Sequence, residues 1–458
     1  MTIRDASKLL RSKEISVKEL VQQSLAAAER DAHLNAFITI TADQALRRAE
    51  ELDEELRQGQ DRGPLHGIPI GFKDLCYTRG TRTTNGSKLF TDFVPDYNAT
   101  VVERLEAAGA ISIGKLNQHE IAYGITSSNP WFGHVRNPWN PECIPGGSSG
   151  GSGVAVAAGS IFCGIGSDTG GSIRCPAAFC GTVGIKPTFG RVSRHGCFPL
   201  GLSLDTVGPL TRSVADAAVV LGVIAGPDLR DDATLRHPAE SFVVDRTNSL
   251  EGVRLGVPDN FYTDRLHPDV ASMYKGAIRT AEELGARITA VTVPDPEGLN
   301  VLARVTLLCE ATAVMRPYLH RREELGKDVM GLLDQGGLVG ASEYISAQRL
   351  RRSMQVAWDR MFRDVDALVT PCSPVPAPRI GQSSVTVSGV DEDTRIASTK
   401  YLRGVNVLGL PAIAIPCGLT SDPLPVGLQI IGSAWSEQRL IAYASALERA
   451  LPAVRLPG

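Results

Sequence analysis

Short runs rich in apolar and β-branched residues recur along this 458-residue chain, and helix-like stretches separate many of them. The runs are GIPIGF (67–72), AISIGK (110–115), IFCGIGSD (161–168), VRLGVP (253–258), ARITAVTV (286–293), DALVTP (366–371), PAIAIPC (411–417) and VGLQIIG (426–432). Between them, ATVVERLEAAGA (99–110) and SVADAAVVLGVIAG (213–226) have the apolar spacing of helices. Strands that alternate with helices predict an α/β fold around a large mixed β-sheet that is mostly buried.

The first 60 residues carry helix signals. Ser16 and Glu19 form a capping-box pattern that opens an amphipathic helix, and residues 41–59 predict another helix that ends near a glycine. The chain has no internal repeat and no low-complexity linker. We therefore expect one domain over residues 1–458, with helices in 1–60 that pack on or extend a core at about 65–220. Two polar stretches, about 228–250 and 380–398, predict surface excursions.

Charge and hydropathy narrow the classes of partner. The formal charge of −3 at pH 7 gives no general attraction to nucleic acid or an acidic membrane. The sequence has no run of about 18 uncharged apolar residues, and its charged N-terminus does not resemble a secretory signal. Nine scattered cysteines favour reduced thiols and a cytoplasmic location. Cys175 and Cys180 lack a second Cys or His pair, so no metal site is predicted.

Two glycine- and serine-rich tracts, residues 146–153 and 169–172, concentrate the candidate chemistry. Flexible linkers share this composition, but both tracts lie between apolar runs that predict core structure. Residues 146–150 also fit the G-x-S-x-G pattern of a nucleophile elbow, which requires a strand directly before the serine. Three prolines precede Ser148 in RNPWNPECIPGG, so that context fails, and the Gly-Lys-Ser/Thr ending of a phosphate loop is absent.

The second tract predicts an anion-binding turn. Thr169, Gly170, Gly171 and Ser172 follow the predicted strand IFCGIGSD directly. Successive residues without bulky side chains allow backbone N–H groups to converge on one point, where they can hold an oxyanion beside a serine hydroxyl. A glycine turn with an incidental serine remains the alternative at this point.

A serine nucleophile needs a base, because its free hydroxyl is protonated at neutral pH. None of the eight histidines lies in a diagnostic context, which leaves lysine as the other candidate. Lys73 follows Ile68, Ile70 and Phe72, which alternate as in a strand with one buried face. On the residues alone, Lys73 is either a surface lysine with a buried stem or a buried amine whose pKa is depressed toward neutrality.

Lys73 in GIPIGFKD, the tract PGGSSGGS and the segment GSDTGGSIRCPAAFCGTVGIKP together resemble the amidase signature family of serine hydrolases. Ser148 lies 75 residues after Lys73, and Ser172 lies 24 residues after Ser148, spacings that fit the family. The resemblance continues through ATVVERLEAAGAISIGKLN, FGHVRNPWN, LDTVGPLTRSVADAA and GLPAIAIPCG…LPVGLQIIG. It is weaker from about 230 to 365 and otherwise covers nearly the whole chain.

The resemblance implies a single α/β domain with a Ser-cisSer-Lys triad. By position, Ser172 is the nucleophile, Ser148 is the bridging serine after a cis peptide bond, and Lys73 is the base. The implied oxyanion hole consists of backbone N–H groups, those of Thr169, Gly170, Gly171 and Ser172. No metal ion and no organic cofactor are implied.

The resemblance also places a pocket wall at residues 122–126. The residues expected to contact substrate are Ala122, Tyr123, Gly124, Ile125, Thr126 and Trp131, with core packing as the alternative. Asp168 and Arg174 flank the nucleophile, and they either fix the loop as an ion pair or contact substrate. We expect Ser149 and Ser152 to hydrogen-bond locally, with Ser152 as the cap of the helix GVAVAAG.

The implied activity is that of a free-standing amidase, which cleaves the C–N bond of a small carboxylic amide. One alternative is the glutamine-hydrolysing A subunit of a glutamyl-tRNA(Gln)/aspartyl-tRNA(Asn) amidotransferase. In that case we would expect partner subunits and nucleic acid as binding partners. QHEIAYGITSSNP (118–130) departs from that subunit's characteristic MDEFAMGSSTENS, and RREELGKDVMGLLDQGG (321–337) does not resemble it either. A carboxybiuret-type nitrogen-catabolism hydrolase is a further alternative. For a free-standing amidase we expect a small-molecule amide substrate, no nucleic acid and no membrane, and we keep a homodimer, common among relatives, as a hypothesis.

Overall fold

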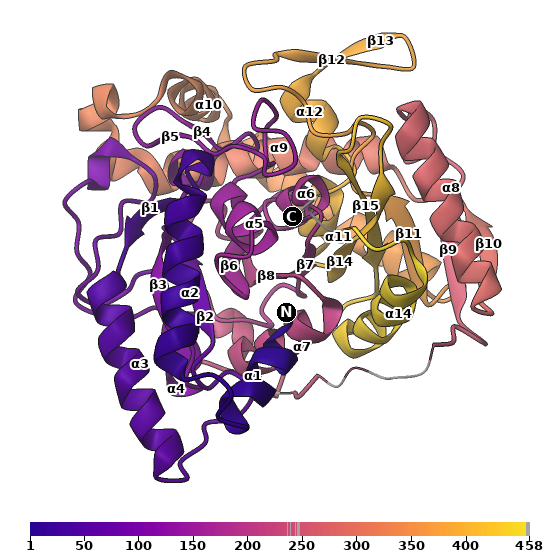
Figure 1. Ribbon diagram of the computed structural model, residues 1–458. Coiled ribbons are helices and arrows are strands. Elements are labelled where there is room, and N and C mark those ends of the chain that lie inside the picture. The colour runs from indigo at the N-terminus through magenta and orange to yellow at the C-terminus, as the bar shows by residue number, and fades with distance from the viewer. Residues whose placement is uncertain (236, 239, 243, 245–247, 455–458) are drawn as a thin grey trace.

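Eleven strands form one continuous mixed sheet through the structure (Figure 1). The computed structural model describes residues 1–454 except 236, 239, 243 and 245–247. The strand order is β1-β3-β2-β6-β8-β7-β14-β15-β11-β9-β10. Neighbouring strands are parallel within β3-β2-β6 and within β11-β9-β10, and they are antiparallel at the other steps. The predicted α/β fold with a large mixed sheet is confirmed.

All eight predicted strands are present in this sheet. They are β2 (Pro69–Lys73), β3 (Ile111–Leu116), β6 (Cys163–Asp168), β9 (Arg254–Pro258), β10 (Arg287–Val291), β11 (Ala367–Pro371), β14 (Ala412–Leu419) and β15 (Pro425–Ile431). The structure adds three strands that the sequence analysis did not predict, β1 (Phe37–Ile40), β7 (Val183–Lys186) and β8 (Thr206–Thr211). β1 lies in the region expected to be helical. It has four residues and lies at the sheet edge without a fully buried side chain, so it carries little periodic signal.

Helices flank the sheet along its length (Figure 1). They are α1 (Ile3–Arg11), α2 (Val17–Arg30), α3 (Ala42–Arg57), α4 (Thr100–Ala107), α5 (Gly150–Ala157), α6 (Arg174–Cys180), α7 (Val214–Ile224), α8 (Pro268–Glu283), α9 (Pro296–Met315), α10 (Lys327–Gly337), α11 (Ala341–Met361), α12 (Thr394–Thr399), α13 (Arg403–Leu408) and α14 (Glu437–Ala450). The capping box predicted at Ser16 and Glu19 opens α2, with both reciprocal hydrogen bonds present. By length and composition alone, one described helical stretch, Pro296–Glu324, could cross a membrane. It contains α9, which packs against α10, α11 and α13 within the fold.

The glycines of β6 explain how a helix approaches the sheet so closely near the candidate site. A Cβ added to Gly164 would come within 2.9 Å of Ser152 in α5. A Cβ at Gly166 would come within 2.9 Å of the Ser149 hydroxyl. Larger residues at these positions would push away α5 and the loop before it, so the glycines allow Ser149 and Ser152 to lie close against β6.

The two predicted surface excursions have different outcomes. Residues 380–398 form the hairpin β12 (Ser384–Val387) and β13 (Val390–Asp393), followed by α12, and project at one end of the molecule (Figure 1). Val375, Val385, Val387 and Ala397 form a small buried cluster beneath the hairpin. The stretch from about 228 to 250 lies partly outside the described residues. Within its described part, Arg230 forms ion pairs with Asp228 and Glu103. Outside the large sheet, β4 (Ser128–Asn129) and β5 (Gly133–His134) also pair as an antiparallel hairpin.

Candidate active site

Lys73 is the last residue of β2, which lies between β3 and β6 in the parallel part of the sheet. All five residues of β2 are buried, so the strand is covered on both faces rather than on one. Gly71 leaves space for the Leu116 side chain of β3, because a Cβ at Gly71 would lie 2.9 Å from that side chain. The side chain of Lys73 has no exposed surface. The surface-lysine interpretation is therefore wrong.

Three hydroxyl groups surround the Lys73 amine. Its Nζ lies 2.7 Å from Ser148 Oγ, 2.9 Å from Ser149 Oγ and 2.9 Å from Ser167 Oγ. Burial lowers the pKa of Lys73 to about 7, although the negative charges nearby, Asp168 among them, favour the ammonium form. An amine with this pKa is neutral in about half of the molecules at neutral pH, so it can accept a proton.

Ser148 lies in the loop between the three-proline segment and α5. The peptide bond from Gly147 to Ser148 is cis, as the resemblance implies. The Ser148 carbonyl accepts a hydrogen bond from the His119 N–H at 3.1 Å, and the Ser127 hydroxyl donates to the Gly146 carbonyl at 2.9 Å. These contacts fix the backbone on both sides of the cis bond and direct the Ser148 hydroxyl toward Lys73.

The hydroxyls of Ser149 and Ser152 hydrogen-bond to β6 rather than locally, and the predicted cap is wrong. Ser152 is the third residue of α5, and its hydroxyl donates to the carbonyl of Ile165 in β6 at 3.2 Å. Ser149 precedes α5, and its hydroxyl donates to the Ser167 carbonyl at 3.1 Å while Lys73 donates to it. The helix starts earlier than predicted because Gly150 and Gly151 adopt helical conformation, which places Ser152 inside the helix.

Ser172 lies in the turn that joins β6 to α6. The main-chain N–H of Ser149 donates to the Ser172 carbonyl at 3.3 Å, so the two glycine–serine tracts lie side by side. Ser172 lines a cavity, and 6% of its surface is exposed. The structure therefore brings Lys73, Ser148 and Ser172 into one region, although they come from three separate segments.

The four predicted oxyanion donors are not equivalent in the turn. The Gly171 N–H donates to Asp168 Oδ1 at 2.7 Å, so it is engaged within the loop. Gly171 has φ of 122°, and a Cβ there would lie 2.7 Å from Leu402. The N–H groups of Thr169, Gly170 and Ser172 donate to no acceptor in the described part of the chain. These three donors are available to a ligand.

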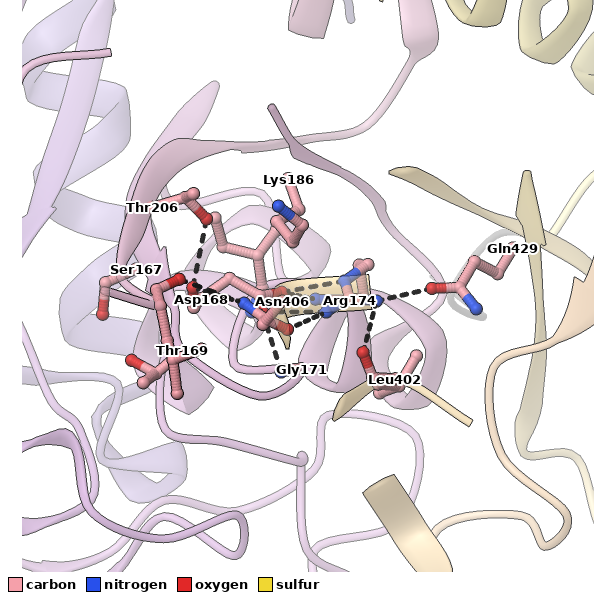
Figure 2. Close-up of polar contacts among 12 residues, drawn as sticks. Ser167, Asp168, Thr169, Gly171, Arg174, Lys186, Thr206, Leu402, Asn406 and Gln429 are labelled. Carbon is pink, nitrogen blue, oxygen red and sulfur yellow. Dashed lines mark hydrogen bonds and ion pairs between the residues drawn. The ribbon is translucent and has the colours of Figure 1, made fainter. Parts of the chain in front are cut away.

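Asp168 and Arg174 form a buried ion pair beneath this turn, with Arg174 Nη2 2.9 Å from Asp168 Oδ1 (Figure 2). Burial alone would raise the pKa of Asp168, but the Arg174 guanidinium and the Asn406 amide hold it well below its usual range. Arg174 also donates to the Leu402 carbonyl at 3.0 Å and to Gln429 Oε1 at 2.6 Å. Neither Asp168 nor Arg174 lines the cavity. Of the two interpretations, the ion pair that fixes the loop is the one observed.

The cavity beside Ser172 has a volume of about 290 Å³. Four of the six predicted contact residues line it, namely Ala122, Tyr123, Gly124 and Ile125. Thr126 and Trp131 do not line it. The Thr126 hydroxyl lies 3.4 Å from His119 Nδ1. The Trp131 indole N–H donates to Glu120 Oε1 at 2.7 Å.

Four charged residues of the cavity wall were not predicted. They are Arg304 of α9, Asp393 of β13, Arg395 of α12 and Arg403 of α13. Each lies more than 130 positions from Ser172 in the sequence, in segments without a local motif. Only the fold brings them to the cavity, so no signal within their own segments could have identified them.

Among the described residues, no group of three or more His, Cys, Asp or Glu side chains is placed to hold a metal ion. Cys175 and Cys180 are buried free thiols within and at the end of α6.

Comparison with known proteins identifies the family. A sequence profile described as Amidase matches residues 19–441. The A subunit of glutamyl-tRNA(Gln) amidotransferase from Geotalea daltonii is 37% identical over 475 residues, which cover 98% of this chain and 97% of that protein. The chain belongs to the Amidase family, as its motifs predict.

Two solved structures have nearly the same fold as this chain. One, reported as an unexpected vestigial protein complex that reveals the evolutionary origins of an s-triazine catabolic enzyme, has a TM-score of 0.95 and 33% identity over 100% of both chains. A crystal structure of an amidase has a TM-score of 0.91 and 35% identity, covering 99% of this chain and 100% of that one. The fold of the described residues is thus closely similar to that of an amidase.

Proposed function

We propose that this protein is a serine amidohydrolase that cleaves the C–N bond of a small carboxylic amide through an acyl intermediate on Ser172. The observation that carries the proposal is the 2.7 Å contact between the buried Lys73 amine and the Ser148 hydroxyl. A lysine whose pKa burial lowers to near neutrality is a competent base in its neutral form, and a hydroxyl bonded to it can relay a proton. Membership of the Amidase family supports the same chemistry.

The proposed mechanism begins with proton transfer along this chain of groups. Neutral Lys73 accepts a proton from Ser148, which accepts one from Ser172 as Ser172 Oγ attacks the amide carbonyl carbon. The carbonyl oxygen becomes an oxyanion, which the N–H groups of Thr169, Gly170 and Ser172 stabilise. Loss of one such donor typically costs about 3–4 kcal/mol of transition-state stabilisation. In this mechanism Gly171 shapes the turn through its bond to Asp168 rather than donating to the oxyanion.

The leaving amine departs with the proton that returns from Lys73 through Ser148. Water then attacks the acyl-Ser172 ester by the same relay, which gives the carboxylic acid and restores the free hydroxyl. The residues present supply nucleophile, relay, base and oxyanion donors, and no cofactor enters these steps. We further propose that the whole chain acts as one cytoplasmic domain on a small-molecule amide, alone or as a homodimer. The nine free cysteines support the cytoplasmic location.

The second candidate function is glutamine hydrolysis as the A subunit of a tRNA-dependent amidotransferase. The 37% identity to that subunit in Geotalea daltonii over nearly the full length favours it. Against it, residues 118–130 differ from the characteristic motif of that subunit, and four of them line the cavity beside Ser172. Because the difference falls at the candidate substrate site, we prefer the free-standing amidase.

A hydrolase of nitrogen catabolism is a further form of the same proposal. The TM-score of 0.95 to the structure connected with an s-triazine catabolic enzyme favours it. Its chemistry at Ser172 would be identical, and only the acyl and amine groups would differ.

A substrate panel tests these possibilities with the purified protein alone. The panel contains glutamine, short aliphatic amides, aryl amides and ureido compounds, with release of ammonia or amine as the readout. Hydrolysis by the protein alone supports the free-standing enzyme. Activity toward glutamine that appears only after addition of partner subunits and tRNA would establish the amidotransferase function instead.

A further inference from the structure

The wall of the cavity beside Ser172 carries an excess of positive charge. Its charged members among the described residues are three arginines, Arg304, Arg395 and Arg403, and one aspartate, Asp393. The rest of the wall is apolar or uncharged, including Leu307, Leu308, Leu332 and Ile396. A cationic cavity with apolar surfaces favours a ligand that combines a negative group with a hydrocarbon part.

Of the three arginines that line the cavity, Arg403 packs against the turn that carries Ser172. A Cβ added to Gly170 would lie 3.5 Å from Arg403 Cγ, so the stem of Arg403 rests beside the loop that carries Ser172. Its Nη2 donates to the Arg395 carbonyl at 3.0 Å, which fixes the guanidinium from one side. The described residues place no carboxylate within 4.0 Å of its guanidinium. Arg403 thus lines the cavity with most of its hydrogen-bonding capacity unused.

Asp393 offsets only part of the positive charge around Arg403. Asp393, the one acidic member of the wall among the described residues, lies 3.7 Å from Arg395 Nε and pairs with that residue. Arg304 donates to the Gln335 side-chain oxygen at 2.9 Å, a neutral partner. Burial lowers the pKa of Arg403 to about 10; the charges of Arg304 and Arg395 act in the same direction, and that of Asp393 acts against them. A positive group that is partly desolvated beside another positive group is stabilised when an anion binds.

We propose that the amide substrate of this enzyme carries a carboxylate group and that Arg403 binds it. This inference rests on the proposed function and adds the chemical class of the substrate. A guanidinium offers a planar pair of N–H donors that matches the two oxygens of a carboxylate. Binding energy at such a group, away from the scissile bond, holds the carbonyl carbon in position for Ser172.

The carboxylate has two possible locations, the acyl part or the amine part of the substrate. Matched substrate pairs separate them. Succinamate and neutral 4-oxopentanamide have nearly the same shape and differ in charge at the acyl end. N-butanoylglycine and N-butanoylaminoacetone differ in the same way at the amine end. We expect the anionic member of one pair to have a kcat/KM higher by about tenfold to a hundredfold, the range for a charge-assisted hydrogen bond.

Arg403→Gln tests the assigned residue, because glutamine retains the Cβ and Cγ atoms beside Gly170 and removes the charge. We expect the variant to lose the preference for the anionic substrate, mainly through a higher KM, while hydrolysis of the neutral partner changes less than about threefold. Arg403→Lys should recover part of the preference, because it restores charge without the planar donor pair. Arg4→Gln is the matched control, since Arg4 is an exposed residue of α1 and its loss changes the net charge equally.

The outcomes separate this inference from the function on which it rests. Equal kcat/KM within both pairs, or an equal loss for both members of a pair in Arg403→Gln, would overturn the carboxylate assignment while the amidase remains. Failure to hydrolyse any amide, together with no labelling of Ser172 by a fluorophosphonate probe, would overturn the proposed function itself. Labelling of Ser172 in Arg403→Gln at the wild-type rate verifies that the variant is folded.

Discussion

Lys73 Nζ and Ser148 Oγ lie 2.7 Å apart at a position where neither residue has any exposed surface. The contact joins the end of a fully buried strand to the loop that follows the cis peptide bond at Gly147. Two further hydroxyls, those of Ser149 and Ser167, complete the polar surroundings of the amine. All three hydrogen-bond partners are neutral, and burial outweighs the nearby negative charges, so the pKa of Lys73 is lowered.

The pH dependence of acylation follows from the lowered pKa of Lys73. The pKa of Lys73 is about 7, and the neutral amine is the active form. The acylation rate should therefore rise tenfold per pH unit well below 7, reach half its maximum near pH 7 and level off above it. Stopped-flow measurement of single-turnover acylation with an aryl amide gives this profile directly. A rate that is independent of pH between 5 and 9 would contradict the lysine base.

Ser148 and Ser149 form a matched pair, since both hydroxyls contact Lys73 at similar distances. Only Ser148 is proposed to pass the proton to and from Ser172. Ser148→Ala should lower kcat by about 10²–10⁴-fold, the usual contribution of a proton-transfer group. Ser149→Ala should lower kcat much less, because it removes a hydrogen bond to Lys73 but leaves the proton relay intact. Steady-state kinetics of the two variants distinguishes them, and equal losses would count against the relay.

The depressed pKa of Lys73 also has a consequence for stability. In the unfolded chain the lysine has its ordinary pKa of 10.5, so between pH 7 and 10 the unfolded state binds more protons than the folded state. The destabilising effect of Lys73 is complete below pH 7 and disappears as the pH rises through 10.5. Relative to Lys73→Met, the wild-type protein should gain about 3–4 kcal/mol between pH 7 and pH 10. Urea unfolding of both proteins at several pH values measures this, and a pH-independent difference would show that Lys73 titrates normally.

The adjacent glycines of the Ser172 turn provide a steric test. A Cβ at Gly171 would lie 2.7 Å from Leu402, and φ of 122° there is unfavourable for any other residue. At Gly170 the nearest atom to an added Cβ is 3.5 Å away, which is an ordinary contact. Gly171→Ala should therefore displace the turn and lower kcat by about 10²-fold or more, as loss of an oxyanion donor does. Gly170→Ala should retain most of the activity. The reverse order in kcat would show that the turn has another conformation in the working enzyme.

Local patterns predicted the framework of the site well. The alternation of Ile68, Ile70 and Phe72 predicted the strand that ends at Lys73, and the second glycine–serine tract predicted the turn that holds Ser172. These features depend on residues that are near one another in the sequence. The assignment of Lys73 to the core was different, because only the spacing to the two serines distinguished it from a surface lysine.

Other features could not be predicted because they depend on tertiary contacts. Ser167 and Ser149 reach Lys73 from different elements, and the partners of Arg174 at Asn406 and Gln429 lie more than 230 positions away. Arg403 and Asp393 likewise reach the cavity only through the tertiary fold. The polar composition of 380–398 predicted a surface excursion, but Asp393 and Arg395 of this stretch line the cavity. A hairpin can be exposed on one side and still contribute to a site on the other.

Localisation of the covalent adduct tests directly whether Ser172 is the nucleophile. Trypsin leaves Ser148 and Ser172 together in the peptide 137–174, so fragmentation mass spectrometry of the fluorophosphonate-labelled protein must locate the adduct. We expect one adduct per chain, on Ser172, formed faster above pH 7 and absent in Ser172→Ala. An adduct on Ser148 or elsewhere, or undiminished labelling of Ser172→Ala, would contradict the assignment of the nucleophile.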